Sequence, residues 1–169
     1  MALAAGHSLG EFSAHVAGGT LSFEDALRAV RRRGELMFES GQARPGTMAA
    51  VLGLDDEALE ALCARASTDS EVCVPANFNS AGQVVISGDV PAVERAMALG
   101  PEAGARRVLP LNVSGAFHSP LMATAEAGLR DFLEGIEFSD PAFPVVSNVT
   151  AQPVSSGSEA RVQFRVVVP

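Results

Sequence analysis

The sequence contains no tryptophan, no tyrosine and no lysine, so all twelve of its basic residues are arginines. Acidic residues outnumber them, and the 169-residue chain carries a formal net charge of −8. Nucleic acids and anionic membrane surfaces are bound mainly by basic patches. The charge balance therefore argues against either of them as a partner.

Cysteine is also scarce. Cys63 and Cys73 lack the CxxC spacing of a zinc site and come with no secretory context, so we expect two reduced core residues and no metal site. No apolar run approaches the length of a membrane span, and the first residues lack the basic start and long apolar stretch of a signal peptide. These absences favour a cytoplasmic protein that has no membrane partner.

A G-x-S-x-G pentapeptide stands near the start of the chain, as Gly6-His7-Ser8-Leu9-Gly10. This spacing allows a serine to occupy a sharp turn between a strand and a helix, with glycines where a β-carbon would not fit. Residues 2–5 are predicted to form the end of this strand, and residues 11–17 are predicted to form the helix. No strand is predicted upstream of residues 2–5 to pair with them. Ser8 is thus a candidate nucleophile, and a glycine-rich turn without chemistry explains the pentapeptide about equally well.

The rest of the chain predicts an α/β protein with two changes of pattern. A capped helix is expected over residues 22–38, with an apolar stripe formed by Phe23, Ala26, Leu27, Val30, Gly34 and Met37. Residues 47–113 then alternate as βαββαβ, the order of a ferredoxin-like split βαβ unit. A further helix follows Ser119-Pro120, and residues 145–149 predict a strand of the larger domain.

These patterns predict the domain organisation. Residues 1–45 and 114–154 would form the larger α/β domain, and residues 46–113 the inserted subdomain. Residues 155–158 resemble a linker, and residues 162–169 form a short alternating strand-like tail, so residues 155–169 are expected to be a divergent end.

Two further side chains are candidates for chemistry. His118 precedes a helix, whose N-terminal field disfavours imidazolium and so favours a neutral ring that could act as a base. Arg33 lies on the apolar stripe of the helix over residues 22–38, where a guanidinium needs a counter-charge such as a bound carboxylate. The structural alternative for His118 is a capping-loop histidine without chemistry. For Arg33 the alternatives are an internal ion pair or a side chain that reaches solvent past the edge of the core.

Four motifs together resemble the malonyl-CoA:acyl-carrier-protein transacylase family, in the right order over about residues 4–150. They are Gly6-His7-Ser8-Leu9-Gly10-Glu11, Arg32-Arg33-Gly34, the segment from Asn77 to Gly88, and Gly115-Ala116-Phe117-His118-Ser119-Pro120. The resemblance implies an incomplete α/β-hydrolase-like large domain with an inserted ferredoxin-like subdomain. It also implies malonyl-CoA and acyl carrier protein as partners, with no cofactor beyond the CoA thioester substrate.

The resemblance assigns a role to each candidate. Ser8 would carry the acyl group, His118 would be the general base, and Arg33 would bind the malonyl carboxylate. The backbone N–H of Leu9 would donate to the oxyanion. Phe117 matches the malonyl-selecting form of the motif, because methylmalonyl-selecting relatives tend to have a serine there.

The sequence departs from the family at both ends. The family begins with strands and a Gly-Gln-Gly loop, and it continues beyond residue 153 in a glycine-rich segment that orients the histidine; neither is found here. We therefore expect a fragment that lacks N- and C-terminal parts, with the resemblance ending near Pro153. The alternatives are the acyltransferase domain of a polyketide synthase, an inactive truncated fragment, and a serine hydrolase of the lipase or patatin type.

Overall fold

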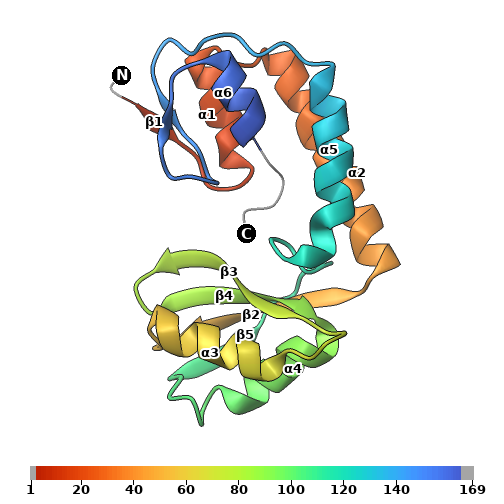
Figure 1. The fold of residues 1–169 in the computed structure, drawn as a ribbon, viewed down its shortest axis with the longest axis vertical. Coiled ribbons are helices and arrows are strands. Elements are labelled where there is room, and N and C mark those ends of the chain that lie inside the picture. The colour runs from red at the N-terminus through yellow and green to blue at the C-terminus, as the bar shows by residue number, and fades with distance from the viewer. Residues whose placement is uncertain (1–2, 165–169) are drawn as a thin grey trace. The chain divides into compact units, whose positions relative to one another are not determined.

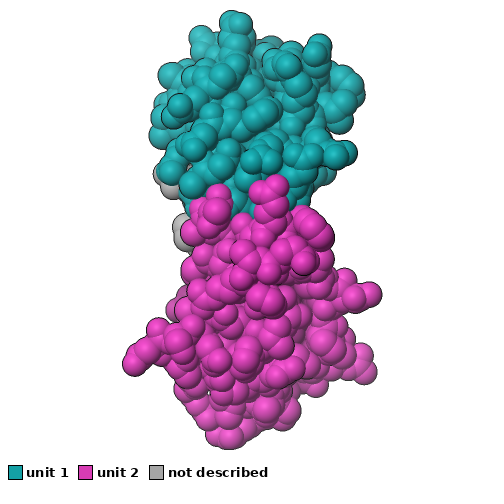
Figure 2. All heavy atoms as spheres, turned by 90° about the vertical axis from the view of Figure 1, so that its right-hand side faces the viewer, with its two compact units in different colours: residues 1–36, 125–168 teal, residues 37–124, 169 magenta. Residues whose placement is uncertain are grey.

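The computed structural model of the protein describes residues 3–164. The chain divides into two compact units, one formed by residues 1–36 and 125–168 and the other by residues 37–124 (Figure 2). Each unit is described by itself. Among the described residues, no helix combines the length and the apolar character needed to span a bilayer.

A three-stranded sheet organises the first unit. Its strands are β1 (Ala4–Ala5), β6 (Val145–Val146) and β7 (Pro153–Val154), in the order β1-β6-β7. β1 and β6 run parallel, with Ala5 opposite Val146, whereas β6 and β7 are antiparallel. The predicted strand before Ser8 is confirmed at Ala4–Ala5, and its neighbour comes from downstream in the sequence. Helix α1 (Gly10–Gly18) follows β1, as predicted.

The end of the chain differs from its prediction. The linker-like residues contain Ser156, which accepts a hydrogen bond from the Glu159 N–H and caps helix α6 (Gly157–Gln163). The strand predicted from Val162 is wrong over residues 162–163, which are helical, and its residues 165–169 lie outside the described part. Phe164 is buried and packs edge-on against Phe12. An aromatic cluster therefore ties this segment to α1.

Helix α2 (Phe23–Ala43) begins where predicted, because the Ser22 hydroxyl accepts a hydrogen bond from the Asp25 N–H. It continues five residues beyond the predicted end at Phe38. The predicted apolar stripe is partly wrong: Phe23 is 73% exposed and Leu27 is 59% exposed. The buried face of the helix contains Ala26, Ala29, Arg33, Leu36, Met37 and Ser40. In the first unit, Phe23 and Leu27 instead line an open apolar groove of about 350 Å³ beside α1.

The second unit contains a four-stranded antiparallel sheet with the order β3-β4-β2-β5. The elements follow the predicted order: β2 (Gly46–Leu52), α3 (Asp56–Ala66), β3 (Cys73–Ser80), β4 (Gln83–Asp89), α4 (Val90–Leu99) and β5 (Arg107–Pro110). α3 and α4 lie against the same face of the sheet (Figure 1). The 3-10 turn at Pro120–Met122 then leads into α5 (Ala123–Glu134).

The core of this second unit lies between the sheet and the two helices. The buried face of α3 is formed by Leu59, Leu62, Cys63 and Ala66. Cys63 and Cys73 are both buried free thiols, and the Cys73 thiol donates to the Cys63 sulfur at 3.9 Å. The neighbouring Cys73 sulfur and burial both disfavour a thiolate at Cys63, so the pKa of Cys63 is raised.

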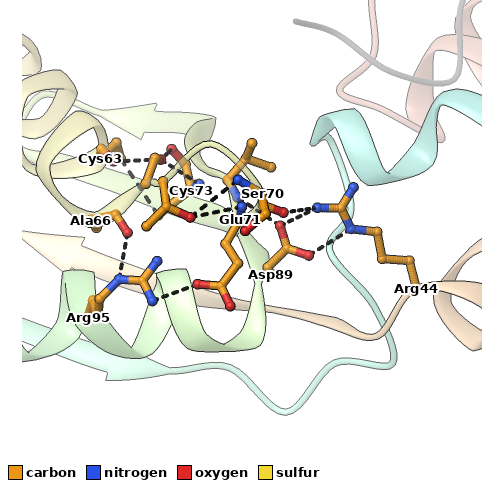
Figure 3. Close-up of polar contacts among 11 residues, drawn as sticks. Arg44, Cys63, Ala66, Ser70, Glu71, Cys73, Asp89 and Arg95 are labelled. Carbon is orange, nitrogen blue, oxygen red and sulfur yellow. Dashed lines mark hydrogen bonds and ion pairs between the residues drawn. The ribbon is translucent and has the colours of Figure 1, made fainter.

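Two arginines anchor the loop between α3 and β3 (Figure 3). Arg44 binds both carboxylate oxygens of Asp89, through Nε at 2.7 Å and Nη2 at 2.8 Å. Arg95 donates to the Ala66 carbonyl and to Glu71. Asp89 is the N-cap residue of α4, but its side chain makes no cap bond. It accepts from Arg44 and from the Val72 N–H instead, so it anchors the loop.

Candidate active site

Ser8 lies in a strained turn between β1 and α1. Its φ of 52° is in the left-handed region, which non-glycine residues seldom adopt because the β-carbon crowds the backbone. The turn is closed by the Gly10 N–H, which donates to the His7 carbonyl, and the Glu11 N–H, which donates to the Ser8 carbonyl. A β-carbon at Gly6 would overlap the Gly10 carbonyl oxygen, whereas one at Gly10 would meet open space. The predicted need for glycine therefore holds at Gly6 only.

Arg33 lies beside Ser8. Its side chain is 9% exposed, and Nη2 donates to the Ser8 hydroxyl oxygen at 2.8 Å. Burial lowers the pKa of Arg33. No carboxylate among residues 3–164 forms an ion pair with it, so the internal ion pair weighed from the sequence is not observed there. The unit thus places a buried cation next to the candidate nucleophile.

Leu9 follows Ser8 and is the N-cap residue of α1. Its side chain is about half exposed. Its backbone N–H donates to no acceptor within the described part of the chain. A free N–H next to the serine hydroxyl, at the start of a helix, is the arrangement that stabilises a developing oxyanion.

Sequence reasoning did not identify two residues that contact this turn, Asn148 and Glu11. The Asn148 side chain donates from Nδ2 to the Gly6 carbonyl at 2.6 Å and accepts from the Ser8 N–H at 2.8 Å. The Asn148 N–H in turn donates to the Glu11 carboxylate at 3.1 Å. Asn148 lies inside the strand predicted over residues 145–149, but β6 ends at Val146, so Asn148 belongs to the turn that follows and the predicted strand gave no signal of its role.

Glu11 is a buried carboxyl on α1, only 3% exposed. Burial raises its pKa from 4.5 to about 7, because desolvation disfavours the charged form more than the Asn148 hydrogen bond favours it. His15 lies on the same helix and is also buried, and burial lowers its pKa to about 4. Its ring packs against that of Phe164.

His118 and Phe117 belong to the second unit. His118 is 8% exposed, and its φ of 57° also lies in the left-handed region. Its loop is held by Ser119, whose hydroxyl donates to the Ala116 carbonyl at 2.7 Å and accepts from the Leu121 N–H. Phe117 is half-buried in this loop. His118 therefore precedes a capped turn, as predicted.

Metal ligands do not gather in this structure. Across residues 3–164, no group of three or more His, Cys, Asp or Glu side chains is arranged to hold a metal ion. The chemistry available at the first-unit site is that of a serine hydroxyl, a guanidinium and backbone N–H groups.

The chain belongs to the acyl transferase domain family, which matches residues 1–165. A malonyl CoA-acyl carrier protein transacylase of Staphylococcus aureus is 46% identical over 147 residues, which are 87% of this chain and 48% of that protein. The corresponding protein of Bacillus subtilis is 46% identical over 157 residues, or 93% of this chain and 50% of its own length. The chain thus spans about half the length of the curated relatives it matches.

Solved structures show the same relationship. An acyl carrier protein S-malonyltransferase from Vibrio cholerae superimposes with a TM-score of 0.92 at 44% identity, over 99% of this chain and 56% of the other. A malonyl-transacylase solved in complex with its type II PKS acyl-carrier protein gives a TM-score of 0.90 at 45% identity, over 96% and 52% of the two chains. The chain has the mixed α/β fold of these proteins.

The comparisons correct one expectation. The resemblance was predicted to end near Pro153, but the family match continues to residue 165. The described part of this segment includes β7 and α6, which pack within the first unit. Composition concealed this continuity, because the serine-rich segment of residues 155–158 runs into the short helix α6.

Replacing Glu11 with Gln should flatten the pH dependence of stability. A carboxyl whose folded pKa is about 7 and whose unfolded pKa is 4.5 stabilises the fold below about pH 4.5, and this contribution is lost as the pH rises through 7. The Gln side chain cannot ionise. The free energy of unfolding of Glu11→Gln, relative to that of the natural chain, should therefore rise by on the order of 3 kcal/mol as the pH increases from 4.5 to about 7. Urea unfolding at several pH values measures this difference.

Glu24→Gln, which removes an exposed carboxylate on α2, is the matched control. His15 affects stability in the opposite sense, because its contribution to the free energy of unfolding is lost as the pH falls from 6.5 to about 4. His15 is present in the natural chain and in both variants, so its effect cancels in the comparison. Equal pH profiles for Glu11→Gln and the natural chain would contradict the buried carboxyl.

Proposed function

We propose that this chain transfers a malonyl group from malonyl-CoA to the phosphopantetheine thiol of acyl carrier protein, through an acyl-serine intermediate. The observation that carries the proposal is the contact of Arg33 with Ser8: a buried guanidinium, which has no carboxylate partner among residues 3–164, donates to a serine hydroxyl on a nucleophile turn. A substrate with its own carboxylate would supply the counter-charge. Names of relatives that share about half of their length with this chain support the same reaction.

In the proposed reaction, the Ser8 hydroxyl oxygen attacks the thioester carbonyl while His118 accepts the hydroxyl proton. The Leu9 N–H donates to the oxyanion of the tetrahedral intermediate. When the carbonyl re-forms, the C–S bond breaks and the CoA thiol leaves with the proton from His118. The carrier thiol then attacks malonyl-Ser8 in the same way, gives its proton to His118, and the serine recovers it.

Arg33 would select the substrate. A malonyl carboxylate can accept two hydrogen bonds from a guanidinium, whereas an acetyl group would leave the buried cation without its counter-charge. A serine hydrolase of the lipase or patatin type has no need for such a cation, and the contact with Ser8 therefore favours the transferase. Phe117 would line the acyl pocket and favour malonyl over bulkier branched groups.

We also propose the finer architecture. The large domain would be α/β-hydrolase-like and made of residues 1–45 and 114–154, and residues 46–113 would be a ferredoxin-like subdomain. The strand order β3-β4-β2-β5 with two helices on one face supports the second assignment. The parallel pair β1–β6 ahead of a nucleophile turn supports the first.

The carrier protein could belong to fatty-acid or polyketide synthesis. One solved relative is in complex with a type II PKS acyl-carrier protein. This observation supports a polyketide acyltransferase as the second candidate. Parallel assays with both kinds of carrier protein distinguish the two. An inactive fragment remains the third reading, and failure of malonyl transfer to any carrier would support it.

Ser8→Ala should abolish malonyl transfer to carrier protein, because no other hydroxyl occupies the turn. Ser13→Ala is the matched control, since Ser13 lies exposed on α1. Its transfer rate should equal that of the natural chain. Radiolabelled malonyl-CoA with gel analysis of the carrier measures both. Equal transfer by Ser8→Ala and the natural chain would remove this serine from the mechanism.

Arg33→Ala should lower malonyl transfer and raise acetyl transfer relative to it, shifting the ratio by roughly 100-fold or more. Arg31→Ala removes the same charge from an exposed position on α2 that pairs with Glu35, and should leave the ratio unchanged. Competition between the two acyl-CoA substrates gives the ratio directly. A parallel fall for both substrates would mean that Arg33 supports the helix and not the ligand.

A further inference from the structure

The Ser8 turn needs support from outside its own sequence. A non-glycine residue with a φ of 52° is held at a cost on the order of 1 kcal/mol or more, and persists where the surrounding structure fixes it. Within the turn, two backbone hydrogen bonds link His7 to Gly10 and Ser8 to Glu11. Both lie on the helix side, so they leave the strand side of Ser8 to be held by another element.

Asn148 supplies that support. β1 and β6 are parallel neighbours, so the residues that follow them meet at the same edge of the sheet. The Asn148 carboxamide uses both of its ends there: Nδ2 donates to the Gly6 carbonyl at 2.6 Å, and Oδ1 accepts from the Ser8 N–H at 2.8 Å. One side chain thus fixes the peptide groups on both sides of His7.

Asn148 is itself held in place. Its backbone N–H donates to the buried Glu11 carboxylate. The turn that follows is closed by the Ser147 hydroxyl, which accepts from the N–H groups of Val149 and Thr150. Glu11 lies in the first turn of α1, directly after the nucleophile turn. The hydrogen bonds of Asn148 therefore reach this turn from both its strand side and its helix side. The result is a closed loop of contacts between segments about 140 residues apart.

We propose that Asn148 is a positioning residue for the nucleophile: its carboxamide clamps the Gly6–Ser8 turn and so fixes the serine hydroxyl and the Leu9 N–H in their reactive places. This inference rests on the proposed function of Ser8. Because the Ser8 N–H is occupied by Asn148, it is not available to an oxyanion, and the next N–H, that of Leu9, is left for that role. The clamp needs a donor and an acceptor on one side chain, which asparagine has and aspartate lacks when ionised.

The first test needs no catalysis. Amide hydrogen exchange followed by NMR on the full chain should show a protected Ser8 N–H. In Asn148→Asp, the acceptor remains but the ionised side chain repels the Gly6 carbonyl, so the protection of Ser8 should fall at least about 10-fold. Asn148→Ala should lose it entirely. A Ser8 N–H that exchanges equally fast in the natural chain and both variants would overturn the clamp.

The second test separates positioning from folding. In malonyl transfer, Asn148→Asp should lower kcat by about 100-fold with little change in KM, because small displacements of a nucleophile cost about that much. Lowering the pH protonates the new carboxyl and restores its donor, so the variant-to-natural rate ratio should rise. Thr150→Ala is the matched control: it removes an exposed side chain of the same turn, whose hydroxyl donates to Gln163 and not to Asn148 or Ser8, and should keep kcat within about threefold.

The outcomes are distinct. An unchanged kcat in Asn148→Asp, or an equal loss in Thr150→Ala, would overturn the positioning role. If Asn148→Ala fails to fold, Asn148→Asp alone decides, because the two side chains have nearly the same volume. If the natural chain itself transfers no malonyl, the proposed function fails, while the exchange experiment still decides whether Asn148 clamps the turn.

Discussion

The parallel pairing of β1 with β6 is the contact on which the candidate site depends. Each strand has two residues, and their pairing joins Ala4–Ala5 to Val145–Val146 across most of the sequence. The turn that follows β1 carries Ser8, and the turn that follows β6 carries Asn148. Since parallel strands end at one edge, a single pairing brings the nucleophile and its support together. Arg33 then approaches Ser8 from α2 in the same unit.

The electrostatics of this unit follow from burial. Arg33, Glu11 and His15 all lie where water is largely excluded, and burial shifts each pKa toward the neutral form. Of these three, it is Arg33 that donates to the hydroxyl proposed to react. A buried cation without an internal carboxylate is costly unless a ligand pairs with it, and that cost is what would exclude uncharged acyl groups.

Local sequence signals predicted the elements well where periodicity was strong. The capped start of α2 and the order βαββαβ could both be predicted, because capping and apolar spacing are local properties. Burial along α2 could not, since Phe23 and Leu27 face a groove and Arg33 takes a buried position. The role of Asp89 could not be predicted either, because Arg44, 45 residues away, binds its carboxylate. Asn148 was missed for the same reason: its partners lie about 140 residues away.

The measurement that tests the central claim most directly is peptide mapping of the chain after brief exposure to malonyl-CoA and acid quenching. If the buried Arg33 and the clamped turn select and activate Ser8, mass spectrometry should find a malonyl ester on the peptide that contains Ser8, and none after exposure to acetyl-CoA under the same conditions. A malonyl group on another residue, or acetyl and malonyl esters formed equally at Ser8, would contradict the account.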